Sequence, residues 1–432
     1  MAVRNPRRWV GWCLLLLAVA PRGRPAPADE TLQKALAKLQ ATTANLPSYA
    51  CIETVERRYF EHGKAASSCE QPPAASTETL QSLDRLRLDV TVADGREIYS
   101  WPGATRFDMR DVNEIIRQGP IGTGSFGSHL LAVFFNQRVT YEYAGEQESG
   151  GRKLLEYRFR VPLDASRYRV NTGEQWQTIA YQGRFWVDAD SLQLERLSLE
   201  ADSLPPASSI CQLTAELEYR NLPIGSDALL LPSRSELRLV FDDQHQTDNV
   251  TTFSACRKYQ AESQLVFGDE PQTESAAQSR VVRAPLALPI GLPVELALTA
   301  PIDMATAAAG DPVAAQVVKP VRRTASNGTL IEAGAVVRGR LTRVERHLLP
   351  RPYYLVAISF NRIEWQGTVS PFAARAEENP DLVRELGATA TGNGGGFRYW
   401  NVGTFLFPSH KPQYVIPAGF QMKWTTLAIR PR

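Results

Sequence analysis

The sequence predicts a mainly β protein built from antiparallel sheets, and three observations support this. In residues 210–220, apolar residues occupy one parity and polar residues the other, as in a strand with one face against a core. The same alternation recurs in residues 153–161 and 237–241, which indicates antiparallel neighbours. At 432 residues, the chain is too long for one core and suits two domains plus an export signal.

Residues 1–28 have the pattern of an export signal. Three arginines lie within residues 1–8, an apolar run follows in residues 9–20, and residues 26–28 form a small-x-small cleavage site. The apolar run is too short to span a bilayer comfortably. We therefore expect a periplasmic or secreted protein after cleavage. The alternative is an uncleaved signal, which would be the chain's one contact with the membrane.

The overall composition excludes some classes of function. Hydrophobic residues make up 43% of the chain and charged residues 22%, which argues against wholesale disorder. A formal net charge of +2 gives no global electrostatic preference for nucleic acid. The five histidines lie in different segments and supply no catalytic triad. We predict that the chain is not an enzyme, that it has no catalytic residues, and that it needs no cofactor.

Four cysteines remain once the signal is removed: Cys51, Cys69, Cys211 and Cys256. An even number in an exported chain suggests disulfides, and four cysteines allow three pairings. We favour Cys51 with Cys69 and Cys211 with Cys256, because each pair flanks a local strand-turn-strand excursion. A metal site is the alternative, but the chain has no Cys-x-x-Cys and no histidine at ligand spacing. We therefore predict no metal.

The first domain is expected over residues 29–268. Residues 29–44 place leucines at helical spacing, and residues 49–60 are expected to form a strand. Asp94 and Gly95 form a hairpin signal between two apolar segments. Residues 122–127 match Gly-x-Gly-x-x-Gly, but no buried strand precedes them as a dinucleotide-binding turn requires. We expect instead a glycine turn in which a hydroxyl of Thr123 or Ser125 caps the helix that follows.

From residue 139 onwards, strands and hairpins are expected up to residue 267. Residues 185–197 contain an aromatic-x-hydrophobic-Asp segment followed by Leu-x-x-hydrophobic, which resembles a hairpin of the LolA/LppX/RseB-like periplasmic proteins. This resemblance implies a curved antiparallel half-barrel around a helical insertion, covering residues 30–268. Family members hold acyl chains in the concave face. The disulfides and the turn at residues 122–127 are not part of that pattern, so lipoprotein carriage itself is not carried over.

Residues 269–285 have the composition of a linker, and the second domain is expected over residues 286–432. Short strands with Ala-Gly turns predict a small β-barrel domain. The segments Thr-Ala-Pro-Ile-Asp and Ile-Glu-Ala-Gly-Ala-Val-Val-Arg-Gly resemble the C-terminal β-barrel of TrbI-type conjugation and type IV secretion proteins. In that family the domain serves envelope assembly. The transenvelope helix of those proteins is missing here.

Two groups of residues are candidates for binding. A concave sheet that binds a lipid or acyl chain needs an apolar inner face, and the aromatic residues expected there are Tyr157, Phe159, Phe185 and Trp186. The densest basic patch contains Arg338, Arg340 and Arg343, which could bind lipid phosphate or an acidic glycan. A solvated strand face that discourages edge pairing explains the same arginines equally well.

Two functions follow from these observations. The first is an exported, non-catalytic protein that binds a lipid or other apolar ligand in its N-terminal half-barrel. The alternative is a structural or assembly component of the bacterial cell envelope that docks other proteins. An open apolar cavity would favour the first, whereas a half-barrel filled by its own helix would favour the second.

Overall fold

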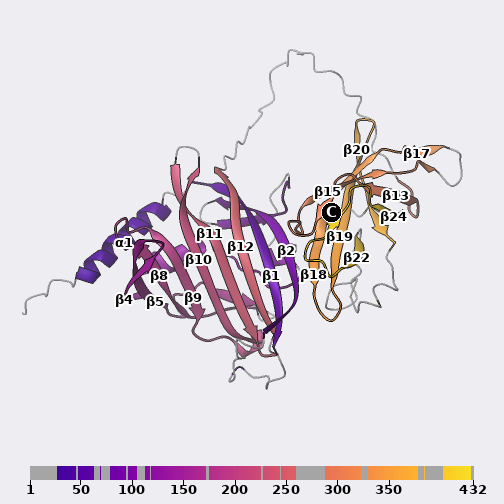
Figure 1. The fold of residues 1–432 in the computed structure, drawn as a ribbon. Helices are drawn as coiled ribbons and strands as arrows, with labels where there is room; N and C mark the ends of the chain where they lie inside the picture. The colour runs from indigo at the N-terminus through magenta and orange to yellow at the C-terminus, as the bar shows by residue number, and fades with distance from the viewer. Residues whose placement is uncertain are drawn as a thin grey trace, which may run out of the picture.

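The computed structural model describes residues 27–44, 47–62, 69, 78–93, 96–104, 112–116, 118–171, 175–224, 227–243, 245–258, 288–322, 328–377, 384 and 402–429. Most of the predicted export signal and the whole predicted linker at 269–285 lie outside these residues. The described chain is mainly antiparallel β, as predicted, and its N-terminal and C-terminal parts are shown in Figure 1. None of its described helices is long and apolar enough to cross a membrane.

The N-terminal part is one curved antiparallel sheet that remains open, as expected for a half-barrel (Figure 1). Each strand pairs with the next in the spatial order β4, β5, β8, β9, β10, β11, β12, β1, β2, β3. Their bounds, in chain order, are β1 (Tyr49–His62), β2 (Glu78–Ala93), β3 (Arg96–Ser100), β4 (Thr140–Ser149), β5 (Arg152–Val161), β8 (Tyr181–Asp188), β9 (Leu194–Ala201), β10 (Ile210–Ile224), β11 (Asp227–Phe241) and β12 (His245–Lys258).

The remaining N-terminal elements are short apart from the first helix. They are α1 (Pro27–Ala44), α2 (Val112–Ile115), α3 (Ser128–Phe134), the hairpin strands β6 (Arg169–Asn171) and β7 (Trp176–Thr178), and the 3-10 helix η2 (Pro206–Ser208). The leucines of α1 pack with α3 against β5, β8, β9 and β10 in one buried apolar cluster. A second cluster joins β1, β2 and β3 to the residues around α2 and to Phe126.

The disulfides join Cys51 to Cys256 and Cys69 to Cys211, so the predicted local pairing was wrong. The reason lies in the order of the strands. One of the two partners of β1 in the sheet is β12, from the far end of the domain, and Ala50 pairs with Arg257 there. Cys51 and Cys256 therefore face each other although 205 residues separate them.

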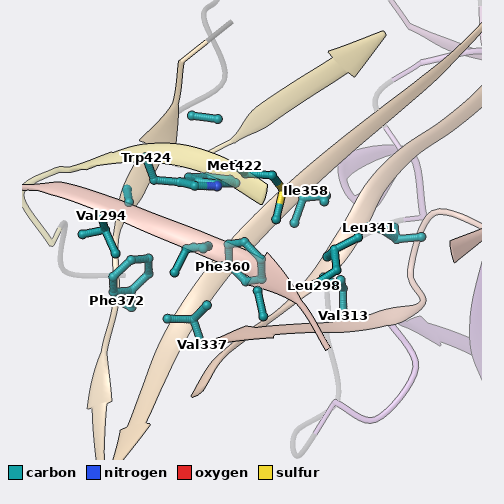
Figure 2. Close-up of a cluster of buried hydrophobic side chains, with 14 of the residues drawn as sticks. Val294, Leu298, Val313, Val337, Leu341, Ile358, Phe360, Phe372, Met422 and Trp424 are labelled. Atoms are coloured by element: carbon teal, nitrogen blue, oxygen red, sulfur yellow. The ribbon is translucent and has the colours of Figure 1, made fainter. Parts of the chain in front are cut away.

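The C-terminal part extends the same antiparallel sheet and curls around its own core. Its strands are β13 (Pro293–Leu298), β14 (Ile302–Asp303), β15 (Pro312–Val317), β16 (Val321–Arg322), β17 (Thr329–Ile331), β18 (Val336–His347), β19 (Tyr353–Trp365), β20 (Thr368–Pro371), β21 (Ala374–Ala376), β22 (Gly403–Pro408), β23 (Val415–Ile416) and β24 (Gln421–Thr426). Figure 2 shows Trp424, Phe360 and Phe372 among the buried side chains that fill this core. The resemblance of this part to the TrbI-type C-terminal domain rests on the sequence segments alone.

Strand β2 joins the two parts. One edge of β2 pairs with β1 along almost its whole length. The other edge pairs with β3 at residues 89–93 and with β18 at residues 82–84. Between these two pairings, the backbone of residues 85 and 87 forms hydrogen bonds with Ala309. An ion pair between Arg87 and Asp311 lies beside the Ala309 contact. The C-terminal part thus continues the N-terminal sheet, with β18 beside β2 in Figure 1.

Candidate functional site

The aromatic residues expected to bind a ligand do not share one surface. Tyr157, Phe159 and Phe185 lie together on the inner face of the sheet, beneath α1 and α3. The rings of Tyr157 and Phe185 stack with centroids 5.1 Å apart. Trp186 points to the opposite face, because successive residues of a strand alternate. There its indole donates to Glu156 at 3.2 Å, and the Arg196 guanidinium lies over the ring at 3.9 Å.

This end of the half-barrel is therefore filled by the chain itself. Phe134 of α3 meets Phe185 edge to face at 5.1 Å, and Tyr141 donates a hydrogen bond to the Val133 carbonyl at 2.6 Å. The hydroxyls of Tyr157 and Tyr181 are buried there without a hydrogen-bond partner in the described part of the chain. That Tyr157, Phe159 and Phe185 bind a ligand remains a prediction, and such a ligand would have to displace a helix.

The other end of the concave face carries buried charges. Arg57 on β1 is 2% exposed and holds Asp84 on β2 with two hydrogen bonds, at 2.7 and 2.6 Å. Tyr59 donates a third hydrogen bond to Asp84 at 3.0 Å. Arg57 also donates to the carbonyl of Gln118, which fixes the chain that follows α2. Bidentate pairs of this kind are among the strongest that side chains form.

The glycine turn at residues 122–127 closes the same face, but not through the predicted cap. The N-cap of α3 is Gly127 and makes no side-chain hydrogen bond, so the prediction of a Thr123 or Ser125 hydroxyl cap was wrong. Instead, Glu97 accepts hydrogen bonds from the backbone N–H groups of Gly124 and Phe126, at 2.7 and 2.9 Å. A carboxylate can satisfy two such donors at once, whereas a hydroxyl that caps a helix accepts from one.

A cavity of about 250 Å³ lies where this charged end meets the C-terminal part. Its N-terminal wall combines the Arg57 and Asp84 pair with apolar side chains of β2, of the residues after β3 and of the residues around α2. Its C-terminal wall comes from β18, β19 and β22. The apolar lining includes Leu86, Trp101, Ile115, Ile116, Val344 and Val402. The charged lining consists of Arg57, Asp84, Arg85, Arg343 and Glu345.

A bulge in β18 decides which of the three predicted arginines reach this cavity. The register with β19 shifts between Leu341 and Arg343, so that Leu341 and Val344, three residues apart, both enter the core. Arg343 therefore faces the N-terminal part, and it lines the cavity. Arg340 lies 5.6 Å over the ring of Trp101. Arg338 instead donates to Glu364 at 2.7 Å on the exposed surface, so the three arginines do not form one anion site.

Arg343 belongs to a chain of polar groups on the cavity side of β18. Its Nε donates to Glu345 at 2.6 Å, and the other oxygen of Glu345 lies 2.8 Å from His347 Nε2. The His347 ring stacks on Tyr353 at 4.3 Å. Because β18 pairs with β2, Glu345 lies directly across from Asp84. Two arginines and two carboxylates thus meet at the junction of the two parts.

Burial and pairing act against each other on these groups. Burial raises the pKa of Asp84, and the Arg57 guanidinium opposes that rise. Burial alone would also raise the pKa of Glu345, but the hydrogen bonds and charges of His347 and Arg343 hold it below its ordinary value. Burial works to lower the pKa of Arg57, and the Asp84 carboxylate outweighs it. The charged forms of Glu345 and Arg57 are thus favoured, whereas the burial of Asp84 works against its charged form.

The lining of this cavity includes no serine, cysteine or histidine, and its hydroxyl groups are those of Thr342 and Thr404. Within the described ranges, no group of three or more acidic, histidine or cysteine side chains is placed to hold a metal ion. A second cavity of about 510 Å³ lies over β5, β8, β9, β10 and β11. Arginine and glutamate side chains such as Arg158, Arg184, Glu200 and Glu216 line it, so it offers no apolar site.

Sequence reasoning overlooked Arg57 and Asp84, although the sequence contains a signal for both. In β2, Asp84 has the same parity as Leu86, Leu88 and Val90, which are buried. In β1, Arg57 has the same parity as the buried Val55. A charged residue in the register of core residues must be buried with a partner, because an unpaired charge would cost too much. A strand pattern with such positions therefore indicates a buried ionic site.

Neither a family model nor a curated protein matches the chain. Comparison with solved structures finds a LolA superfamily protein from Nitrosomonas europaea, 11% identical with a TM-score of 0.26, covering 55% of this chain and 97% of that one. A DUF1329 family protein from Desulfovibrio piger is 10% identical with a TM-score of 0.27, covering 55% of this chain and 95% of that one. At these scores the function has to be argued from the residues of this chain.

Proposed function

We propose that this protein is an exported, non-catalytic binding protein that takes a small apolar ligand into the cavity between its two parts. The half-barrel supplies one wall of the site and the C-terminal part supplies the other. The location would be the periplasm, which suits the two disulfides. No cofactor or nucleic acid has a role in this function.

One observation carries the proposal. The aromatic end of the half-barrel is filled by α1 and α3, whereas the charged end keeps an apolar cavity lined by Leu86, Trp101 and Ile115. Ligand sites are typically apolar with a few well-placed polar groups, and they are often found where two domains meet. A volume of about 250 Å³ is at the small end of such sites, which suits a short chain or a single ring.

The test uses 1-octanol, a neutral short-chain probe, in a calorimetric titration of the full chain. We expect one molecule to bind per chain. Val402→Trp, which fills the cavity from its β22 side, should weaken this binding about tenfold or more. Val369→Trp is the matched control, because Val369 is 60% exposed on β20 and does not line the cavity. Equal binding by both variants, or no binding by the parent protein, would contradict the proposal.

The second candidate is a structural component of the cell envelope, and the filled half-barrel favours it. A helix packed over the aromatic face leaves that face without a ligand-binding surface, while Leu131 and Phe135 of the α3 region stay 38% exposed. A protein that binds no apolar probe at either end of the half-barrel would favour this role. Crosslinking in intact cells would then be the way to identify its neighbours.

A further inference from the structure

We infer that the ligand of this cavity is a short monocarboxylate amphiphile whose head group binds to Arg343. This inference rests on the proposed function and adds the chemical class of the ligand. It starts from one atom. Nη1 of Arg343 is buried and has no hydrogen-bond partner among the described residues, whereas Nε of the same side chain is engaged by Glu345. A buried guanidinium donor without an acceptor is costly, and an anionic ligand would supply the acceptor.

The other two arginines that line the cavity are already engaged. Arg57 gives two hydrogen bonds to Asp84 and further ones to backbone carbonyls. Arg85 donates to Glu56 at 2.8 Å and to the Ala307 carbonyl at 3.2 Å. Arg343 is therefore the arginine of this lining that has a buried donor without a partner among the described residues.

The charges at the cavity favour a ligand with one negative charge over one with two. Each arginine of the lining has a carboxylate partner: Arg57 has Asp84, Arg85 has Glu56 and Arg343 has Glu345. A monocarboxylate adds one negative charge, which Nη1 of Arg343 would pair, whereas a dianionic phosphate adds a second negative charge without a partner. A neutral alcohol would accept a hydrogen bond from Arg343 without the added strength of a charged acceptor.

The size of the cavity limits the apolar body of the ligand. A water molecule takes about 30 Å³ in the liquid, so the cavity of about 250 Å³ holds about eight groups of that size. Leu86, Trp101 and Ile116 offer an apolar wall for such a body. Octanoate has the right charge and about the right length, and it is the probe for the test.

Calorimetric titration of the full chain with octanoate, octyl phosphate and 1-octanol tests the inference. We expect octanoate to bind at least about tenfold more tightly than 1-octanol and octyl phosphate. Arg343→Gln should weaken octanoate binding by about 10-fold to 100-fold while changing 1-octanol binding by less than about threefold. Arg338→Gln is the matched control on the same strand, because its guanidinium pairs with Glu364 away from the cavity.

The possible results separate the two ideas. Equal affinity for octanoate and 1-octanol would overturn the head-group assignment and leave the apolar site intact. Tighter binding of octyl phosphate would replace the carboxylate by a dianion. Binding of none of the three would overturn the proposed function itself.

If Arg343→Gln does not fold, carbon-13 NMR of carboxyl-labelled octanoate bound to the unmodified protein tests whether the carboxylate lies beside Arg343. Its carboxyl should titrate below the pH at which it titrates free in water, and an unchanged or higher value would count against Arg343.

Discussion

Several residues of this chain have ionisable side chains at positions where the strand pattern predicts a core residue. Glu53 is the most buried acidic example, 3% exposed on the inner face of β1. Burial raises the pKa of Glu53 to about 8, and the Glu97 carboxylate adds to the rise. Glu53 is therefore protonated at neutral pH, whereas Asp84 and Glu345 each pair with an arginine. A few buried charges thus divide the half-barrel into an apolar end and a polar end.

Glu53 should make the folded state less stable as the pH rises. The unfolded chain loses this proton near the ordinary pKa of 4.5, whereas the folded chain keeps it up to about pH 8. The free energy of unfolding therefore falls between these two values and levels off above pH 8. Glu53→Gln should remove that fall and stabilise the protein at pH 7 by about 3 kcal/mol, at about 1.4 kcal/mol per pH unit.

Urea unfolding between pH 6.5 and 8 is the measurement. His129 also contributes to the pH dependence, because burial lowers its pKa to about 4 from 6.5, but this contribution is the same in the parent protein and in Glu53→Gln and cancels in their difference. Glu61→Gln, an exposed change on the same strand, is the control. A parent protein and a Glu53→Gln variant with parallel pH profiles would show that Glu53 is ionised in the folded state.

At the scale of the elements, partners distant in the sequence decide which residues meet. Strand β1 lies between β2, which follows it in the chain, and β12, which ends the domain. The Cys51–Cys256 disulfide fastens that distant pairing. In β18, one extra residue changes the parity of the strand and brings Arg343 to the cavity instead of the core. Simple alternation along the sequence could predict neither result.

The disulfide between β1 and β12 gives a prediction about stability. A crosslink that spans 205 residues removes much of the freedom of the unfolded chain. We expect the double variant Cys51→Ala/Cys256→Ala to lose about 2–5 kcal/mol of unfolding free energy. Peptide mapping under non-reducing conditions should show Cys51 joined to Cys256 and Cys69 joined to Cys211. Peptides that join Cys51 to Cys69 would contradict this pairing and support the local pairing that the sequence predicts.

At the scale of the whole molecule, the two parts are held together along one edge of β2. The amide of Arg87 donates to the Ala309 carbonyl, and the amide of Ala309 donates to the Arg85 carbonyl, each at 2.8 Å. Gly310 makes this approach possible. It has a φ of +108°, and a Cβ added to it would lie 2.3 Å from the Arg87 carbonyl oxygen. A larger residue at position 310 must therefore push the two parts away from each other.

Gly310→Ala should loosen the junction and open the ligand cavity. We expect faster hydrogen exchange of the Arg87 amide and weaker binding of 1-octanol, with the core of each part unchanged. Gly334→Ala is the matched control, because Gly334 also has a positive φ of +87°, but a Cβ added to it would meet no described atom within 4 Å. Equal protection of the Arg87 amide in both variants would mean that the junction does not depend on this close approach.

The sequence by itself determined the class of the fold and most of its elements. Alternating apolar residues identified strands such as β5 and β10, and helical spacing identified α1, because side-chain periodicity depends on local backbone geometry. The Asp94–Gly95 signal correctly placed the hairpin between β2 and β3. Clear periodicity of this kind needs no knowledge of distant contacts.

Only the tertiary structure decided the disulfide pairing, the filling of the half-barrel by α1 and α3, and the cavity between the two parts. Each depends on which segments meet across long stretches of chain, as Cys51 does with Cys256 and Asp84 with Glu345. Local patterns carry no information about such partners, because chain topology brings them together after the local elements are fixed. Arg57 and Asp84, two ionisable residues at core positions, were the one indication of that junction in the sequence. The partners that stabilise these buried groups are known only from the folded structure.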